Sequence, residues 1–278
     1  MVDDLTSRML DPSVANPARI YDYLLGGKDN FPADREVAEQ IIAIAPTARE
    51  VTRQNRAFLR RAVRYLAGEA GVRQFLDIGS GLPTQGNVHE IAQAVAPDCR
   101  VVYVDNDPVV VAHGHALLED DKTVVVGADL HEPEAIVGHP EVRDVFDFDQ
   151  PIAVLIVSVL HFVTDEQDPF GIVARLRDAV PAGSHLAISH ATRDIPPRPD
   201  MTAAEMAEMA ARAQQLYEQA AVPIVHRTAA EVRRLFGDWD LVDPGLVFIQ
   251  SWRPDDEGAA LPGGFYGAIG RKRARAPA

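Results

Sequence analysis

From residue 73 onward the chain repeats one pattern, in which a short apolar run rich in β-branched residues is followed by a longer segment of helical periodicity. The runs are almost continuously apolar and lack the alternation of a strand that has one face in water. Five such runs predict five strands, at residues 74–78, 100–105, 123–126, 152–157 and 185–189. Continuous apolar strands separated by helices indicate a mostly parallel sheet covered on both faces, so we expect a doubly wound α/β core.

The residues ahead of this core are helical in character. Apolar side chains recur there at spacings of three and four, and Gly26 and Gly27 would end the first helix as a C-cap does. Three helices are predicted, at residues 18–25, 32–44 and 47–67. We therefore expect an N-terminal helical cap, residues 1–72, packed on an α/β domain that covers residues 73–271.

The C-terminal third of the chain departs from this pattern. Prolines at positions 196, 197 and 199 lead into a predicted helical insertion at about 196–227. Thr228 and Glu231 have the spacing of a capping box, which predicts the start of another helix. Two strand-like runs, residues 245–252 and 265–270, predict a closing hairpin, and residues 272–278 form a basic tail.

Composition narrows the classes of function. The chain has 27 basic and 41 acidic residues, a formal net charge of −14, so the phosphates of a nucleic acid would repel it. Cys99 is the only cysteine, which excludes an internal disulfide and favours a reducing compartment. The acidic N-terminus has no signal-peptide pattern, and the longest apolar stretch, residues 152–163, is shorter than the roughly 20 residues of a membrane-spanning helix. We expect a cytoplasmic protein with no membrane or nucleic acid partner, and the sequence leaves its oligomeric state open.

The most informative local pattern is Asp77-Ile78-Gly79-Ser80-Gly81, in which a predicted strand runs into two glycines ahead of a helix. Glycines let the backbone approach a ligand closely. The dinucleotide-binding fingerprint would place a third glycine at position 84, where the chain has Thr84. Asp77, inside the end of the strand, suits a ligand that carries an ammonium group and no pyrophosphate.

The next two predicted strands also end in carboxylates. Asp105 ends the second strand, where a carboxylate can accept hydrogen bonds from both hydroxyls of a ribose. Asp107 precedes Pro108 and is expected to cap the following helix. Asp129 follows the third strand and is placed to accept a hydrogen bond from an adenine amino group. Since ligands of parallel sheets bind at the carboxyl ends of the strands, these carboxylates are expected to line one site.

Residues 77–81, 104–108 and 128–130 resemble the three cofactor motifs of class I S-adenosylmethionine-dependent methyltransferases. More narrowly, the chain from about residue 12 to residue 271 resembles an actinobacterial family of methyltransferases that was first catalogued as a domain of unknown function. The closer match is carried by residues 16–31, 55–59, 159–163 and 188–190.

The resemblance implies a Rossmann-like sheet of seven strands with the last strand antiparallel, and S-adenosylmethionine as the cofactor. It places Gly79 and Gly81 beside the methionyl part of the cofactor, Asp105 at the ribose and Asp129 at the adenine. Residues 82–84, Leu-Pro-Thr, depart from the small or glycine residues that are common after the second glycine, and they stiffen the loop.

Five further residues are expected to bind the cofactor. Arg56, on the helix before the first strand, is a candidate for binding the methionyl carboxylate, although a surface salt bridge would explain it equally well. The resemblance implies that the segment of Tyr21 and Asn30 folds over the cofactor. The others are Asn106, Leu130 and Ser158, which adjoin the motifs or follow the fourth strand.

Methyl transfer from a sulfonium is an in-line displacement that positioning and desolvation can accelerate, so a general base is needed only when the acceptor must lose a proton. His161 follows the fourth strand and His190 ends the fifth, and either could be that base. Alternatively, His161 packs against the cofactor and His190 hydrogen-bonds a loop. No metal site is expected, because His113 and His115 are two residues apart on a predicted helix and point to different faces.

The function predicted from these residues is S-adenosylmethionine-dependent methyl transfer to a small-molecule acceptor, on oxygen, nitrogen or carbon. A non-catalytic S-adenosylmethionine-binding protein that regulates or scaffolds a partner is the alternative, because the cofactor motifs are intact while nothing compels either histidine to act as a base. A nicotinamide-dependent reductase is disfavoured by Thr84 and Asp77.

Overall fold

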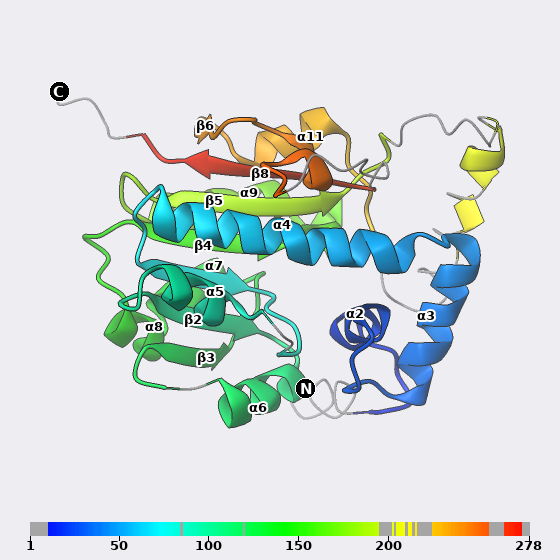
Figure 1. Ribbon diagram of the computed structural model, residues 1–278, viewed down its shortest axis with the longest axis horizontal. Helices are drawn as coiled ribbons and strands as arrows, with labels where there is room; N and C mark the ends of the chain where they lie inside the picture. Colours follow the sequence, from blue (N-terminus) through cyan, green and yellow to red (C-terminus); the bar gives the residue numbers. More distant parts are fainter. Residues whose placement is uncertain are drawn as a thin grey trace.

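The computed structural model describes residues 11–83, 86–118, 120–194, 202, 204–208, 211–212, 215, 224–255 and 264–273. Thr84, most of the predicted helical insertion and the basic tail beyond residue 273 lie outside these described residues. The described part of the chain folds into one mixed sheet with helices on both faces (Figure 1).

Five parallel strands form the body of the sheet, in the order β3-β2-β1-β4-β5. Their bounds are β1 Gln74–Ile78, β2 Arg100–Asp105, β3 Thr123–Gly127, β4 Ile152–Val157 and β5 His185–Ala191. These strands coincide with the five apolar runs and confirm the predicted doubly wound, mostly parallel architecture. The strand order reverses between β1 and β4, which is where sheets of this kind place their ligand site.

The remaining strands form an antiparallel edge. β8 (Phe265–Arg271) pairs antiparallel with β5, and the two-residue strands β6 (Asp240–Leu241) and β7 (Val247–Phe248) both pair antiparallel with β8. The sheet of the described residues therefore has eight strands, where the resemblance implied seven.

The strand-like run at residues 245–252 forms only a short strand, so that prediction is wrong beyond residue 248. The chain turns there into the 3-10 helix η3 (Ile249–Ser251). The turn places Trp252 in the core, where its side chain is completely buried. Arg61 fixes the turn by donating hydrogen bonds to the carbonyl oxygens of Ile249 (2.6 Å) and Trp252 (2.8 Å).

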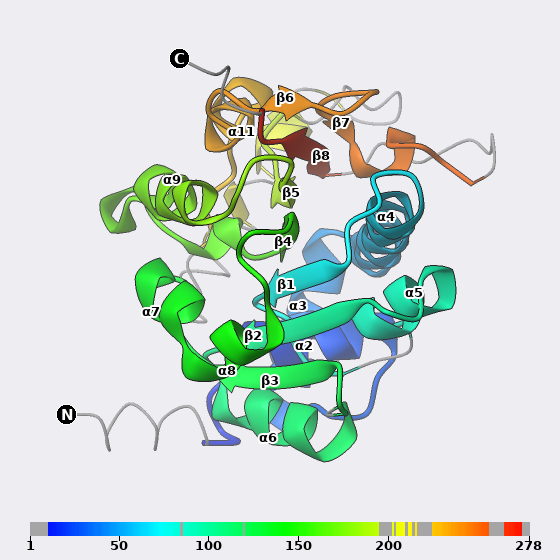
Figure 2. The ribbon, with the colours of Figure 1, turned by 90° about the vertical axis from the view of Figure 1, so that its left-hand side faces the viewer.

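Helices cover both faces of the sheet (Figure 2). One face is covered by α4 (Ala48–Gly68), α5 (Val88–Val95) and α6 (Pro108–Leu117), the other by α7 (Pro133–Gly138), α8 (Pro140–Val145), α9 (Pro169–Ala179) and α11 (Ala229–Leu235). Consecutive strand residues point alternately into two apolar cores, as Phe75 and Leu76 do in β1. The predicted caps are confirmed: Asp107 accepts a hydrogen bond from the Val109 N–H (2.7 Å) at the start of α6, and Thr228 caps α11.

The N-terminal helices α2 (Pro17–Leu25) and α3 (Pro32–Ile44) stand beyond the carboxyl ends of the parallel strands, where α4 extends past the sheet (Figure 1). The three helices predicted there are all present. Gly26 ends α2 in the left-handed conformation, with φ of 88°, as a C-cap glycine does. Among the described helices, none combines the length and the apolar character needed to cross a membrane.

Phe58 on α4 is fully buried and meets the ring of Trp252 edge to face, with the ring centroids 5.6 Å apart. We expect Phe58→Ala to lower the free energy of unfolding by about 3–5 kcal/mol, the usual cost of a large cavity in a core. Chemical denaturation followed by circular dichroism measures the change. Leu117→Ala, at a side chain that is 67% exposed, is the control and should cost less than about 0.5 kcal/mol. Equal losses in the two variants would contradict the central packing role of Phe58.

Candidate active site

A cavity of about 380 Å³ lies at the carboxyl ends of β1 to β4, and residues of α2 and α4 complete its walls. This volume is within the range of small-molecule sites, roughly 300–1,000 Å³. All the predicted cofactor-binding residues except Asn30 line the cavity. The side chains that the sequence placed at three separate strand ends are therefore brought to one wall.

The two glycines of the first motif shape the floor of the cavity. Gly79 and Gly81 have φ values of 71° and 67°, in the left-handed region that favours glycine. A side chain at Gly79 would collide with Val159, whereas a Cβ at Gly81 would face open space. The Gly79 N–H donates to the Val104 carbonyl oxygen at 2.7 Å, so the loop bends across the end of β2. The bend leaves bare backbone facing the cavity.

Asp77, at the end of β1, is a buried carboxylate in this wall. Burial raises its pKa to about 7, the charge of Arg56 opposes that rise, and the charge of Asp105 adds to it. Its carboxylate accepts no hydrogen bond from the described residues. A buried carboxylate without donors is costly to ionise. A cation bound in the cavity would supply the missing partner.

Asp105, at the end of β2, is held by two backbone donors. Its Oδ2 accepts from the Gly81 N–H and its Oδ1 from the Asp107 N–H, both at 2.9 Å. Burial raises the pKa of Asp105 to about 6, although these hydrogen bonds lower it. Each carboxylate oxygen can accept a second hydrogen bond. Asp105 can therefore receive a pair of hydroxyl groups while its orientation stays fixed.

Asp129, after β3, is held by two side chains that also line the cavity. Its Oδ1 lies 2.9 Å from the His131 N–H and 2.6 Å from the ring Nδ1 of His131. Its Oδ2 accepts from Asn106 Nδ2 at 3.3 Å. Burial works to raise the pKa of Asp129, but the hydrogen bonds from His131 and Asn106 outweigh it and lower the pKa. Leu130, next in the chain, adds an apolar surface that is largely buried.

The contribution of His131 was not predicted, although its spacing from Asp129 offered a signal. An aspartate commonly accepts a hydrogen bond from the backbone two residues ahead, which brings that residue's side chain beside it.

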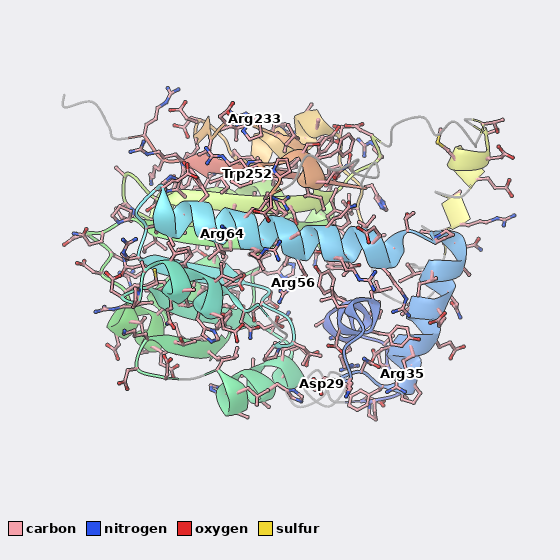
Figure 3. All side chains as sticks on the ribbon, in the orientation of Figure 1. Asp29, Arg35, Arg56, Arg64, Arg233 and Trp252 are labelled. Carbon is pink, nitrogen blue, oxygen red and sulfur yellow. The ribbon has the colours of Figure 1, made fainter. Side chains whose placement is uncertain are left out.

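Arg56 reaches the cavity from α4, on the side where α2 faces the strand ends (Figure 3). Burial raises the pKa of Asp77, Tyr21 and Tyr103, and the charge of Arg56 opposes each rise, so the guanidinium acts on the β1 end of the cavity. Asp77 and Arg56 thus offer an anion and a cation to the same part of the cavity, an arrangement that suits a zwitterionic amino-acid group.

Ser158, which follows β4, has a φ of 64°, an unusual conformation for a residue with a side chain. Its N–H lies 3.2 Å from the Ser189 carbonyl oxygen and 3.0 Å from Ser189 Oγ. Strained backbone of this kind is found where surrounding structure fixes it, often at functional sites. Here the fixed turn places Ser158 in the cavity wall.

A hydrogen-bond chain, buried at Ser189 and Asn55 and partly buried at Tyr21, connects this turn to the N-terminal helices. Ser189 Oγ donates to Asn55 Oδ1 (2.6 Å), Asn55 Nδ2 donates to Tyr21 Oη (2.9 Å), and Tyr21 Oη donates to the Thr52 carbonyl oxygen (3.3 Å). The chain joins β5, α4 and α2, and it holds Tyr21 in the cavity wall. Burial raises the pKa of Tyr21, so its hydroxyl stays protonated near neutral pH.

Asn30 does not line the cavity but lies behind Asp22, which does. Asn30 Nδ2 donates to Asp22 Oδ2 at 2.7 Å, and the Asp29 N–H donates to the same oxygen at 3.0 Å. A side chain at Gly27 would collide with the Asp22 carboxylate. Asn30 therefore supports the wall from behind, and the loop that follows α2 wraps around one buried carboxylate.

His161 and His190 are both buried, and neither lines the cavity. The ring of His161 packs against those of Phe162, Phe265 and His190, with centroids 4.3, 5.3 and 5.7 Å away. Its Nδ1 has no hydrogen-bond partner among the described residues. Burial lowers the pKa of His161 well below its usual value, so its ring is neutral.

His190 is held on both ring nitrogens. Nδ1 donates to the Ala191 carbonyl oxygen (2.7 Å), and Nε2 accepts from Arg227 Nη1 (2.9 Å). Burial is the main cause that lowers the pKa of His190 to about 4. His161 packs against Phe162, which does line the cavity, and His190 lies next to His161. Among the described residues, no group of three or more potential metal ligands comes together.

Comparisons with known proteins show which family and which solved structures the chain as a whole resembles. The model of a family described as S-adenosyl methyltransferase matches residues 3–273. A crystal structure of a candidate methyltransferase from Thermobifida fusca is 42% identical, with 95% of this chain and 97% of that chain covered and a TM-score of 0.87. A crystal structure of a DUF574 family protein from Streptomyces avermitilis is also 42% identical, with 94% and 99% covered and a TM-score of 0.87. Comparison with curated proteins finds no match.

The pKa of Asp77 predicts a pH-dependent stability. A carboxyl group whose pKa is higher in the folded protein than in the unfolded chain binds its proton more tightly when folded, so the fold gains stability as pH falls through that pKa. Between pH 8 and pH 5, the free energy of unfolding of the unaltered protein should rise by about 2–3 kcal/mol relative to Asp77→Asn. Urea denaturation at the two pH values measures this difference. Asp238→Asn, at a side chain that is 96% exposed, is the control, and parallel pH profiles for the unaltered protein and Asp77→Asn would refute the assignment.

Proposed function

The chain belongs to the S-adenosyl methyltransferase family, and on that premise we propose that it transfers the methyl group of S-adenosylmethionine to a small-molecule acceptor by in-line displacement. The observation that carries the proposal is the convergence of Asp77, Asp105 and Asp129, from three adjacent strands, on one cavity that Arg56 also lines. The cofactor supplies, when bound, an electrophilic methyl group on a sulfonium sulfur.

The residues present fit this cofactor. Asp77 binds the ammonium of the methionyl group and Arg56 its carboxylate, because the two opposite charges lie at the same end of the cavity. Asp105 accepts the ribose hydroxyls with the lone pairs that its two backbone donors leave available. Asp129, oriented by Asn106 and His131, accepts the adenine amino group. The bare backbone at Gly81 leaves space for the methionyl chain.

The remaining walls of the cavity perform the other tasks of methyl transfer. Tyr21 on α2, with Val159 and Phe162 after β4, lines the same cavity, and these side chains would exclude water from the reacting atoms of a bound substrate. The hydrogen-bond chain through Asn55 fixes these walls relative to one another. Since an in-line displacement gains most from fixed geometry, positioning can supply much of the acceleration. A carboxylate-rich lining also favours a cationic cofactor electrostatically.

The small size of the acceptor follows from two observations. The cavity of about 380 Å³ has the size of a small-molecule site and would have to hold the cofactor as well as the acceptor. The net charge of −14 opposes binding of a nucleic acid. We therefore place the acceptor among small molecules.

The assay that tests the proposal follows transfer of an isotopically labelled methyl group from S-adenosylmethionine to a panel of metabolites that carry hydroxyl, amine or activated carbon nucleophiles. Labelled product with at least one acceptor class is the expected result. Cofactor binding without transfer to any acceptor would favour the regulatory alternative, and absence of cofactor binding would contradict the proposal.

Asp105→Ala should weaken binding of S-adenosylhomocysteine by about 1–3 kcal/mol, because the ribose hydroxyls lose their acceptor. Isothermal titration calorimetry measures the affinity. Asp238→Ala, outside the cavity and 96% exposed, is the matched control and should leave the affinity unchanged. If Asp105→Ala also binds with unchanged affinity, the ribose assignment is wrong.

His161→Ala separates a base from a supporting residue. Loss of a general base typically reduces turnover by ~10²–10⁴-fold. Because His161 is neutral and packs behind Phe162, we propose that it supports the cavity wall, so turnover should fall by no more than about tenfold. Circular dichroism should show that the His161→Ala variant is folded. A loss above a hundredfold would instead establish His161 as the base.

A further inference from the structure

A buried ionic cluster of Arg19, Asp34 and Asp107 joins the N-terminal helices to the loop that follows Asp105 at the end of β2. Arg19, Asp34 and Asp107 are 1%, 0% and 2% exposed. Arg19 Nε donates to Asp34 Oδ2 at 2.9 Å, and Arg19 Nη2 donates to the Val14 carbonyl oxygen at 2.6 Å. Neither Arg19 nor Asp34 lines the cavity, so the proposed chemistry assigns them no task.

The remaining nitrogen of the guanidinium is turned toward Asp107. Arg19 Nη1 lies 3.8 Å from Asp107 Oδ2, and neither atom has a hydrogen-bond partner among the described residues. Asp34 alone would neutralise Arg19, and it also accepts the N–H groups of Asn16 and Phe31, both at 2.8 Å. The N-terminal segment is thus complete without Asp107. Because the attraction between Arg19 and Asp107 acts where water is excluded, it can hold the Asp107 side chain in place.

Asp107 in turn contacts the carboxylate of Asp105. The Asp107 N–H donates to Asp105 Oδ1, and the Gly81 N–H donates to Asp105 Oδ2. Asp107 Oδ1 accepts from the Val109 N–H, which fixes the start of α6. A continuous series of contacts therefore runs from Arg19 on α2 through Asp107 to the carboxylate of Asp105.

We propose that Arg19 is a positioning residue for the cofactor site: through Asp107 it fixes Asp105 in the orientation that accepts the ribose hydroxyls. The N-terminal helices and the loop between β2 and α6 then act as one unit in recognising the ribose. The inference rests on the proposed function, because it needs Asp105 to bind the ribose.

A positioning role for Arg19 predicts a difference in affinity between two ligands that a merely structural role does not predict. If Arg19 acts through Asp105, changes in the cluster weaken recognition of the two ribose hydroxyls and leave contacts with the rest of the ligand intact. A general loosening of the fold would weaken every ligand alike. S-adenosylhomocysteine and its 2′,3′-dideoxy counterpart, which lacks both hydroxyls, distinguish the two cases.

Asp107→Asn is the main variant, because asparagine still caps α6 through its side-chain oxygen while the charge that faces Arg19 is removed. Its affinity for S-adenosylhomocysteine should fall about tenfold, the size expected for one weakened charge-assisted contact, and its affinity for the dideoxy ligand less than about twofold. Arg19→Lys, which retains the charge but loses the planar fork, should show the same difference between the ligands.

Arg49→Gln is the matched control. Arg49 also ties α2 to α4, by donating to the Tyr23 carbonyl oxygen (3.2 Å) and pairing with Glu39 (3.3 Å), but it has no contact with Asp107. It should change neither affinity by more than about twofold. Equal losses for both ligands in Asp107→Asn, or no loss for either, would overturn the positioning role. Failure of the unaltered protein to bind S-adenosylhomocysteine would overturn the proposed function itself.

Discussion

The burial of Asp77 at the end of a central strand is the constraint on which the site depends. Its carboxylate has been removed from water, yet the described residues give it no hydrogen bond, and its pKa rises to about 7 as a result. Asp105 is also buried, but two backbone donors hold it, and Asp129, which is only partly buried, is held by the side chain of Asn106 and by His131. Asp77 is thus a carboxylate that a bound cation would stabilise, whereas Asp105 and Asp129 are already oriented as hydrogen-bond acceptors.

The N-terminal segment is built on the same principle, with buried carboxylates as its organising groups. Asp22 accepts hydrogen bonds from the loop after α2. Asp34 accepts hydrogen bonds from the start of α2, the start of α3 and the guanidinium of Arg19. Breaking such a group from one side strands a buried charge, so the segment is fixed as a whole. Residues 16–31 thus include side chains that line the cavity, such as Tyr21 and Asp22, and side chains that support it from behind, such as Asn30.

The strands and the strand-end carboxylates could be predicted because each rests on local information. A continuous apolar run identifies a covered strand, and parallel strands bring their carboxyl ends to one edge. The chain from Ser189 through Asn55 to Tyr21 could not be predicted, because it joins residues 134 and 34 positions apart. The end of β7 was missed for a similar reason, since burial of Trp252 against α4 decides where the chain leaves the sheet.

The two histidines show where position at a strand end stops being informative. The sequence places His161 after β4 and His190 at the carboxyl end of β5, as the structure does, but it does not say in which direction each ring points. In the structure both rings face a buried cluster that includes Arg227 and Phe265, with Phe162 between His161 and the cavity. Their role as a base stays a prediction, and the geometry offers a supporting role in its place.

A crystal structure of the protein soaked with S-adenosylmethionine addresses the central claim most directly. We expect ligand density in the cavity at the carboxyl ends of β1 to β3, with the ammonium beside Asp77, the ribose hydroxyls on Asp105 and the adenine amino group at Asp129. A cavity that stays empty at saturating cofactor, or one in which the ligand lies with its adenosyl group away from these carboxylates, would contradict it.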